Sequence, residues 1–383
     1  MAEKIVKKDW VSSFNLIGVP KVNDYTFKTD ERSEKSNWVY NAMNLGIDCG
    51  ENAGCVYCEL MGGYSEENEN HIYAHGKKDD GSDDFEKQIV VDWEDRFNDD
   101  ILEEIGDMSF ITVGLEKTNA DKTHYKKFLS AYDAIAYIRE HLTEDMVVNV
   151  RGNLKYSSYN DTVQVRKNVT SIVLSKAEDS SKYKATFTQS ILIDKDSVSL
   201  KADNIDKDKG VIFVNARVLD YVKEVNGVEV KGQYPYYKTF EFAVNLENEK
   251  QCKTIYEKLF KVKKGVTQIT MEGDFIESGA VVTTTLDDLP DEIRDLVEMG
   301  VYTEEEACAK CTANGNRERR MVLRKPLIRL VGDDKVPVVQ KFEERFTEND
   351  LVLNCMTKNK AEDVAEVEEE TDSDDSMSWL NKL

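Results

Sequence analysis

The sequence predicts a mainly β protein with two similar five-stranded units in tandem, helical insertions and a disordered acidic tail. Three observations support this fold class: alternating stretches rich in β-branched and aromatic residues, a pattern that occurs twice, and an acidic C-terminal segment. The chain has 383 residues, of which 40% are hydrophobic, and this is enough for more than one domain with its own core.

Seven segments have the composition and alternation of strands. They are 38–49, 55–61, 146–156, 163–174, 183–193, 211–225 and 236–244. Apolar residues at helical spacing predict two helices, over 131–142 and 252–262.

The two predicted helices are followed by the same pattern. A strand with a central glycine follows each helix, at Gly152 and Gly273, and an Arg-Lys pair opens a last apolar strand, at 166–167 and 324–325. Three strands, a helix and two strands is the arrangement of the OB-fold, a Greek-key barrel that binds oligonucleotides or oligosaccharides. A glycine suits the point where a coiled barrel strand bends. The alternative is two unrelated β domains whose glycines coincide.

The domain organisation follows from this repeat and from shifts in composition. The second unit has the longer separation between its glycine and its Arg-Lys pair, which predicts a helical hairpin inserted there. A block over 77–107 and the last 23 residues are strongly acidic and are expected to be solvated. The predicted domains are an N-terminal extension (1–37), a nucleic-acid-binding OB-like domain (38–176), a second OB-like domain (177–332) with a helical insertion (287–316), a C-terminal linker or helix (333–360) and a disordered acidic tail (361–383).

Charge and composition exclude several classes of protein. The formal net charge is −23, so the chain is not a uniformly basic nucleic-acid coat. No stretch approaches the roughly 18 consecutive apolar residues that a membrane helix needs, and charges near the N-terminus do not fit a signal peptide. We therefore expect a cytoplasmic protein without a membrane partner.

The first unit carries a local excess of basic residues beside aromatic ones. If Val148, Val150 and Leu154 face the barrel interior, alternation sends Arg151 and Lys155 to the outer face. Cationic side chains follow phosphates and rings stack on bases, so this combination suits single-stranded nucleic acid. About half of the aromatic rings are expected to be core instead. The predicted nucleic-acid-binding residues are Arg151, Lys155, Tyr156, Tyr159, Arg166, Lys167, Trp38, Tyr40, Tyr57 and Tyr73.

The second unit provides an internal control for this prediction. Glu272 and Asp274 stand where Arg151 and Asn153 stand in the first unit, which turns the corresponding face acidic. We therefore expect the first unit to be the main binding unit.

The cysteines could supply zinc ligands, but their spacing favours another explanation. Seven cysteines are an odd number and a low density, which indicates reduced thiols. Cys55 and Cys58, with Cys49 nearby, fall around a strand, while Cys308 and Cys311 fall on a predicted helix. Buried free thiols explain both groups, so we expect no metal and no other cofactor.

Catalytic motifs are absent from the sequence. It contains no phosphate-binding loop, no nucleophile elbow and no zinc-protease helix motif, so we expect a protein that is not an enzyme. Acid pairs at 79–80, 83–84 and 99–100 could hold Mg²⁺ for a nuclease, but solvated loops explain them as well.

The acidic tail ends in a short apolar tip. Like charges extend a linker, and a Trp-Leu tip can anchor in a pocket of a partner protein. The predicted partner-binding residues are Asp372, Asp374, Asp375, Trp379 and Leu380.

With a basic, aromatic core followed by an acidic tail, the chain resembles the single-stranded-DNA-binding proteins of bacteriophages. The resemblance covers roughly 38–175 and the tail, and it lies in organisation, because the tip lacks the Pro-Phe ending of the bacterial proteins. It implies a protein that coats single-stranded DNA in phage replication or recombination, in the host cytoplasm, while its tail recruits replication or recombination proteins. By this resemblance the core role falls on Arg151, Lys155, Tyr156, Arg166 and Lys167.

The rival interpretation is a protein-binding module, either a virion or assembly component or an acidic DNA mimic. The negative charge of the chain outside its tail favours this alternative.

Overall fold

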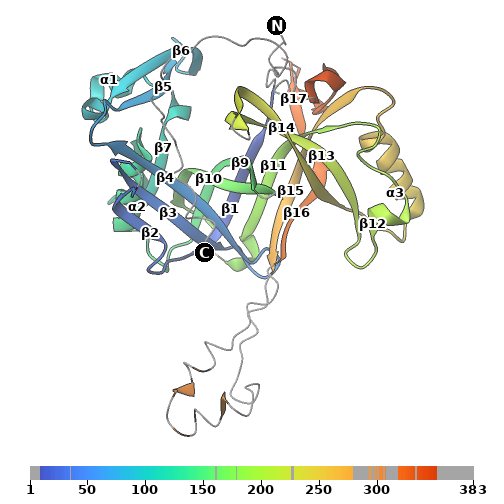
Figure 1. The fold of residues 1–383 in the computed structure, drawn as a ribbon, viewed down its shortest axis with the longest axis horizontal. Helices are drawn as coiled ribbons and strands as arrows, with labels where there is room; N and C mark the ends of the chain where they lie inside the picture. Colours follow the sequence, from blue (N-terminus) through green and yellow to red (C-terminus); the bar gives the residue numbers. More distant parts are fainter. Residues whose placement is uncertain are drawn as a thin grey trace.

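The computed structural model describes residues 9–278 apart from 35, 160–161, 178 and 226–227, scattered positions between 293 and 307, and residues 318–351 apart from 333. The prediction of a mainly β chain is confirmed, since a 15-stranded sheet runs through both halves of the molecule (Figure 1). Most of the predicted insertion at 287–316, and the tail with its predicted partner-binding residues, lie outside the described residues.

Five strands of the first half pair in a closed ring, in the order β1–β3–β4–β10–β9 and back to β1. They are β1 (Ser12–Lys21), β3 (Trp38–Asp48), β4 (Cys55–Ser65), β9 (Val148–Tyr159) and β10 (Thr162–Leu174). Only β4 and β10 run parallel within this ring. Helix α2 (Ala131–His141) precedes β9 and is capped at its N-terminus by Ser130, whose hydroxyl accepts a hydrogen bond from the Tyr132 N–H.

Five strands of the second half pair in the same cyclic order, β11–β13–β14–β16–β15 and back to β11. They are β11 (Lys184–Ile193), β13 (Val211–Val225), β14 (Val228–Ala243), β15 (Val266–Ser278) and β16 (Glu318–Pro326). Again the third and fifth strands, β14 and β16, are the parallel pair. Helix α3 (Glu249–Ile255) and the helical turn Tyr256–Phe260 precede β15.

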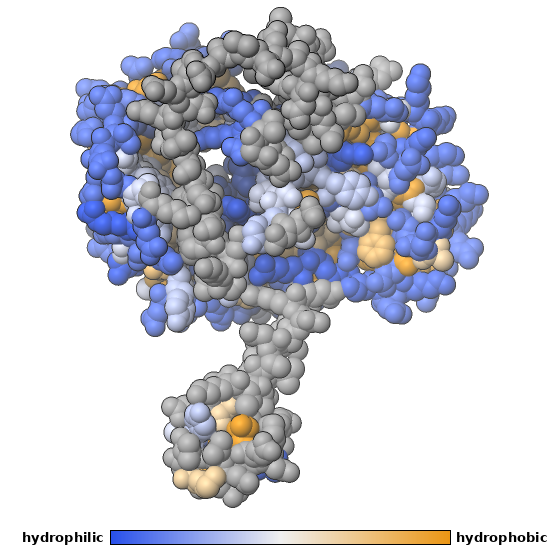
Figure 2. Space-filling view, in the orientation of Figure 1, coloured by the Kyte–Doolittle hydropathy of each residue, from blue (hydrophilic) through white to orange (hydrophobic). Residues whose placement is uncertain are grey.

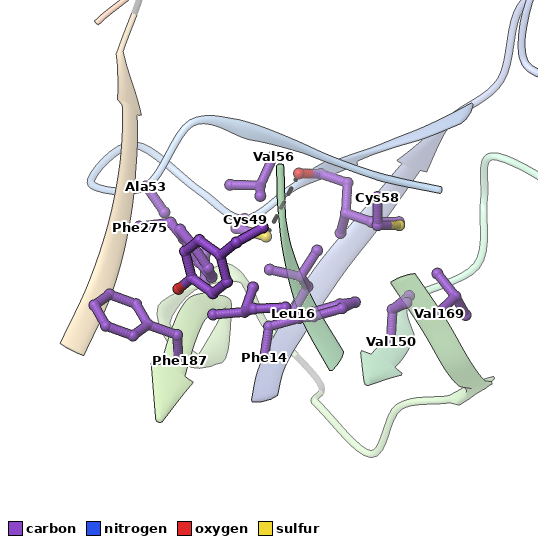
Figure 3. Packing of buried hydrophobic residues seen from close by; sticks show 14 of the residues in the cluster. Phe14, Leu16, Cys49, Ala53, Val56, Cys58, Val150, Val169, Phe187 and Phe275 are labelled. Atoms are coloured by element: carbon purple, nitrogen blue, oxygen red, sulfur yellow. Dashed lines mark hydrogen bonds between the residues drawn. The ribbon is translucent and has the colours of Figure 1, made fainter. Parts of the chain in front are cut away.

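The two halves share a sheet and a core. Strand β1 pairs antiparallel with β11, from Ser12 opposite Gln189 to Ile17 opposite Lys184. Phe14 of the first half and Phe187 and Phe275 of the second belong to one buried cluster (Figure 3). Burial of this continuous apolar surface holds the halves together.

Each half places a phenylalanine opposite its mid-strand glycine. Phe14 is the cross-strand partner of Gly152, and Phe187 is the partner of Gly273. A Cβ on Gly152 would lie 1.8 Å from the carbonyl oxygen of Asn168, and one on Gly273 would lie 2.4 Å from the Phe187 ring. The glycines are therefore required by close approach, and the sequence repeat corresponds to a repeat in packing.

Three segments fold in ways that the sequence analysis did not predict. The described part of the segment 1–37 is not an extension, because its strand β1 closes the first ring. The acidic block over 77–107 belongs to a folded insertion whose small core contains Ala74, Val91 and Ile105. The segment 333–360 is not simply a linker or helix, because β19 (Lys341–Phe346) pairs with β15.

The remaining elements lie mostly in that insertion and at the edges. The strands are β2 (Phe27–Arg32), β5 (His71–Lys77), β6 (Asp83–Asp92), β7 (Ile111–Lys117), β8 (Thr123–Phe128), β12 (Ile205–Asp206), β17 (Ile328–Val331) and β18 (Val336–Val339). Helix α1 spans Asp99–Glu104, and single helical turns occur at Trp93–Asp95, Asp107–Ser109, Ser180–Lys182, Ala202–Asn204 and Glu348–Leu351.

The described cysteines are thiols packed against the barrel. Cys58 faces the core, Cys55 lies on the opposite side of β4, and burial raises the pKa of Cys58 to about 12. Cys308 and Cys311 lie outside the described residues. Within the described part of the chain, no three His, Cys, Asp or Glu side chains are arranged to hold a metal ion. None of the helices described is long and apolar enough to cross a membrane.

Candidate nucleic-acid interface

Strand β9 alternates as the sequence analysis predicts. Val150 and Leu154 are buried in the core, while Arg151, Asn153 and Lys155 are exposed on the outer face. The prediction that Arg151 and Lys155 share an outward row is therefore confirmed.

Strand β10 adds residues to the same side of the sheet. Arg166 is the cross-strand partner of Lys155, and Asn168 is the partner of Asn153. Directly paired residues of antiparallel strands share a face, so these side chains gather in one area. We call this area the cationic face and define it as Arg151, Asn153, Lys155, Arg166 and Asn168.

Arg151 is the most available cation of this face. It is exposed, and it has no ion-pair partner among the residues that the structure describes. Its guanidinium can therefore bind an external anion without first giving up a carboxylate.

Three of the predicted aromatic residues lie on the outer side of the first ring. Asn168 of β10 is level with Glu59 of the parallel strand β4, which brings Tyr57 next to Arg166. Tyr57 is half-buried and borders the cationic face. Trp38 and Tyr40 lie further along β3 and stack on each other, with ring centroids 5.0 Å apart.

Tyr159 and Tyr73, two more of the predicted binding residues, lie further away. Tyr159 is 50% exposed near the end of β9, beside the undescribed residues 160–161. Tyr73 is 67% exposed, but it belongs to the separate β5–β6 ribbon in the acidic insertion. The structure does not bring Tyr73 to the cationic face.

The prediction that Tyr156 lies on the binding surface is wrong. Tyr156 is 4% exposed because it follows Leu154 by two positions and so shares its inward side. Its hydroxyl donates to Gln189 Oε1 over 2.9 Å, and its N–H donates to Asp220 Oδ2 over 2.7 Å. Burial, together with Asp220, raises the pKa of Tyr156 well above its ordinary value.

Lys167 also turns away from solvent, which contradicts its predicted role. It is paired with buried Leu154 across the strands, and its side chain is 10% exposed. Its ammonium group lies 2.9 Å from Glu277 Oε1 and 4.7 Å from the centroid of the Phe275 ring. Lys167 therefore joins the two halves instead of facing a ligand.

The second half covers one end of the cationic face. Lys155 Nζ lies 3.3 Å from Asp220 Oδ1, and this carboxylate is 5% exposed. Burial raises the pKa of Glu59, although Arg166 lowers it. Burial also raises the pKa of Tyr236 to about 12, again with a lowering contribution from Arg166. The Arg166 end thus lies against the second half, and the Arg151 end is open.

Charged side chains also gather where the two halves meet. Figure 2 shows that hydrophilic side chains cover much of the described surface in this view. Lys238 of β14 is half-buried at this junction, and burial and the neighbouring Lys167 lower its pKa. The junction therefore brings additional positive charge close to the covered end of the face.

The corresponding face of the second half is internally paired. Arg324 lies 2.7 Å from Asp274, and Lys325 lies 3.1 Å from Glu272. Each of these two acids is paired with a neighbouring base, so its charge is largely neutralised within the second half.

Sequence reasoning missed the two acids that organise the junction. Asp220 and Glu277 are carboxylates that the strands β13 and β15 hold in buried positions. Each contacts a lysine more than 60 positions away in the chain, so no local pattern could have identified its partner.

Comparisons with known proteins place this architecture in a family. The closed rings, the shared sheet and the outward cationic row define a mainly β protein with a candidate polyanion-binding face. The chain belongs to the YorF family, whose model matches residues 67–273, more than half of its length.

Two further comparisons add little. No curated protein matches the sequence. Among solved structures, the chain matches the crystal structure of a deletion mutant of the single-stranded DNA binding protein from Thermus aquaticus, with 9% sequence identity and a TM-score of 0.30. That match covers 70% of this chain and 88% of the other. At such a TM-score the likeness does not establish a shared fold.

Proposed function

We propose that this chain is a non-enzymatic single-stranded-DNA-binding protein of the cytoplasm that acts in phage DNA replication or recombination. The observation that carries the proposal is the outward row Arg151, Asn153 and Lys155 on β9, with Arg166 beside it on β10. A concentrated cationic row in a chain of net charge −23 is the kind of surface that binds a polyanion.

We further propose that the two halves are tandem OB-like barrels. The closed ring order, the single parallel pair and the helix before the fourth strand of each ring support this assignment. OB-folds bind oligonucleotides on the outside of the barrel, around strands two and three and the adjoining loops. Strand β4, which carries Tyr57 beside the cationic face, is the third strand of the first ring.

The mechanism would combine electrostatic capture with stacking. Arg151 would take a phosphate, with Lys155 and Arg166 continuing the path toward the junction, and Tyr57 would contact a base. The contact would not depend on base identity, because phosphates and ring faces are common to all nucleotides.

Binding to oligo-dT at several salt concentrations tests the function. Affinity should fall steeply with salt, because phosphate contacts release counterions. Arg151→Glu should abolish most of the binding. Lys207→Glu changes charge equally at an exposed turn in the second half and should have little effect. Salt-insensitive or absent binding by the wild-type protein would contradict the proposal.

The acidic tail would recruit replication or recombination proteins through Trp379 and Leu380. Removal of residues 361–383 should leave oligo-dT affinity intact or slightly tighter, because it removes negative charge. The same truncation should abolish capture of a replication or recombination protein. A clear loss of DNA affinity would instead make the tail part of the binding site.

A protein-binding module is the second candidate, and one observation favours it. Tyr73, Phe85 and Val90 of the acidic ribbon are 67%, 59% and 54% exposed. Exposed apolar side chains among acids suit a basic protein partner better than DNA. This function predicts a stable protein complex that Tyr73→Ala weakens, together with no oligonucleotide affinity.

A further inference from the structure

The β7–β8 hairpin of the insertion continues the sheet that bears the cationic face. Strand β7 pairs parallel with the end of β10, and β8 pairs antiparallel with β7. The sheet therefore runs β9–β10–β7–β8, and β8 is its last strand.

The registers align Arg151 with a lysine on the last strand. Arg151 is paired with Ser171 of β10, Ser171 with Thr112 of β7, and Thr112 with Lys127 of β8. Paired residues share a side of the sheet, so these four lie in one row across four strands. The row spans about 14 Å at ordinary strand spacing, and every member can donate a hydrogen bond.

The next row ends in an exposed aromatic ring. Asn149 is paired with Val173, and Val173 with Gly114. Tyr125 of β8 covers Gly114, since a Cβ on that glycine would lie 3.0 Å from the tyrosine ring. Tyr125 is nevertheless 58% exposed. One side of its ring therefore lies against the backbone of Gly114, and the rest is open to solvent, which suits stacking on a base.

The hairpin is basic although it follows the acidic block at 77–107. Residues 117–127 contain four lysines and one acid, Asp121. Lys127 pairs with Asp107 over 2.8 Å, but both side chains are about half exposed or more, so this pair is weak and can be replaced by a phosphate. Lys126 points to the other side of the strand, with its ammonium 4.2 Å from the centroid of the Tyr137 ring.

We infer that the β7–β8 hairpin extends the DNA-binding surface beyond the open, Arg151 end of the cationic face. Tyr125 stacks on a base, and the row from Arg151 to Lys127 binds the sugar-phosphate backbone. This inference rests on the proposed function for the identity of the ligand. The bound strand would cross the sheet over β9, β10, β7 and β8, away from the covered Arg166 end.

The test measures oligo-dT affinity of the full-length protein and its variants at two salt concentrations. Tyr125→Ala should weaken binding about 5- to 150-fold, the loss expected for one stacked base, and Tyr125→Phe should restore it. Tyr237→Ala is the matched control, because Tyr237 is 56% exposed on the second half. Lys127→Gln should lower the slope of log affinity against log salt by about 0.7, and Lys207→Gln should not.

The outcomes separate this inference from the proposed function. If the wild type binds and Arg151→Glu abolishes binding, but Tyr125→Ala and Lys127→Gln behave like their controls, the hairpin is not part of the surface and only this inference is overturned. If the wild type does not bind oligo-dT, both are overturned. If Tyr125→Ala proves unstable, the salt slope of Lys127→Gln decides the question alone.

Discussion

The two halves of the molecule share a strand order and a packing motif, yet their outer faces differ in charge. In the first half, Arg151 is exposed and unpaired among the described residues. At the corresponding place in the second half, Glu272 pairs with Lys325, and Asp274 pairs with Arg324. The availability of a basic residue therefore depends on its partners, and a count of charges along the chain does not reveal it.

The comparison also separates two kinds of ion pair. Lys167 and Glu277 form a buried pair between the halves, with side chains 10% and 4% exposed. Lys325 and Glu272 form a pair within the second half, with side chains 70% and 35% exposed. The first pair links the two halves in the interior, whereas the second only reduces the net charge of an exposed surface.

The largest expected effects come from the phenylalanines that lie on the two glycines. Phe14→Ala and Phe187→Ala should each lower the free energy of unfolding by about 3 to 5 kcal/mol, because each leaves a cavity in the shared core. Chemical denaturation should show one transition for both variants, since the core is continuous. Two separate transitions would show that the halves unfold independently.

Glu277→Gln should have the next largest effect on stability. It leaves the Lys167 charge buried without its partner, which costs about 3 kcal/mol. Glu272→Gln in the exposed pair is the control and should cost less than about 1 kcal/mol. A double-mutant cycle of Lys167→Met and Glu277→Gln should give a coupling energy well above that of Lys325→Met and Glu272→Gln. Equal coupling energies would contradict the distinction.

Much of the first ring was predictable from local sequence patterns. The alternation of β9 placed Arg151 and Lys155 outward, and Gly152 and Gly273 marked equivalent positions in the two halves. Strand β1 was missed although Phe14 and Leu16 alternate, because Gly18 and Pro20 occupy the next inward positions and weaken the strand pattern.

The errors in the site have two sources. Alternation with Leu154 already indicated that Tyr156 points inward, and only its hydrogen-bond partners in the other half, Gln189 and Asp220, were beyond the reach of the local pattern. Lys167 was counted as a surface base because nothing near it in sequence indicates Glu277. Tyr125 and Lys127 were overlooked because the acidic block beside them dominates the local charge, and only strand pairing shows their relation to Arg151.

The charge difference between the halves should be reversible in part. Glu272→Gln combined with Asp274→Asn releases Lys325 and Arg324 on the second half. Oligo-dT affinity at low salt should rise by about threefold, because two cations become available and the net charge becomes less negative. The rise should disappear at high salt. An unchanged affinity would show that the strand does not reach the second half.

The smallest expected effect concerns the loss of folding stability at low pH. It compares Asp194 of the second half with Arg151 of the first. Arg217 of the second half donates to Asp194 over 2.9 Å. Burial alone would raise the pKa of Asp194, but hydrogen bonds from Arg217, the Asp196 N–H and Ser197 outweigh it, so this pKa is lowered. A lowered folded-state pKa gives stability that is present above the unfolded value of about 4 and is lost as the pH falls through the folded value. Because both side chains are partly exposed, the loss should be less than about 1 kcal/mol.

Denaturation at pH 7 and pH 3 should show a smaller loss of stability on acidification in Asp194→Asn than in the wild type. In contrast, Arg151→Gln should leave the loss unchanged, because Arg151 has no carboxylate partner among the described residues.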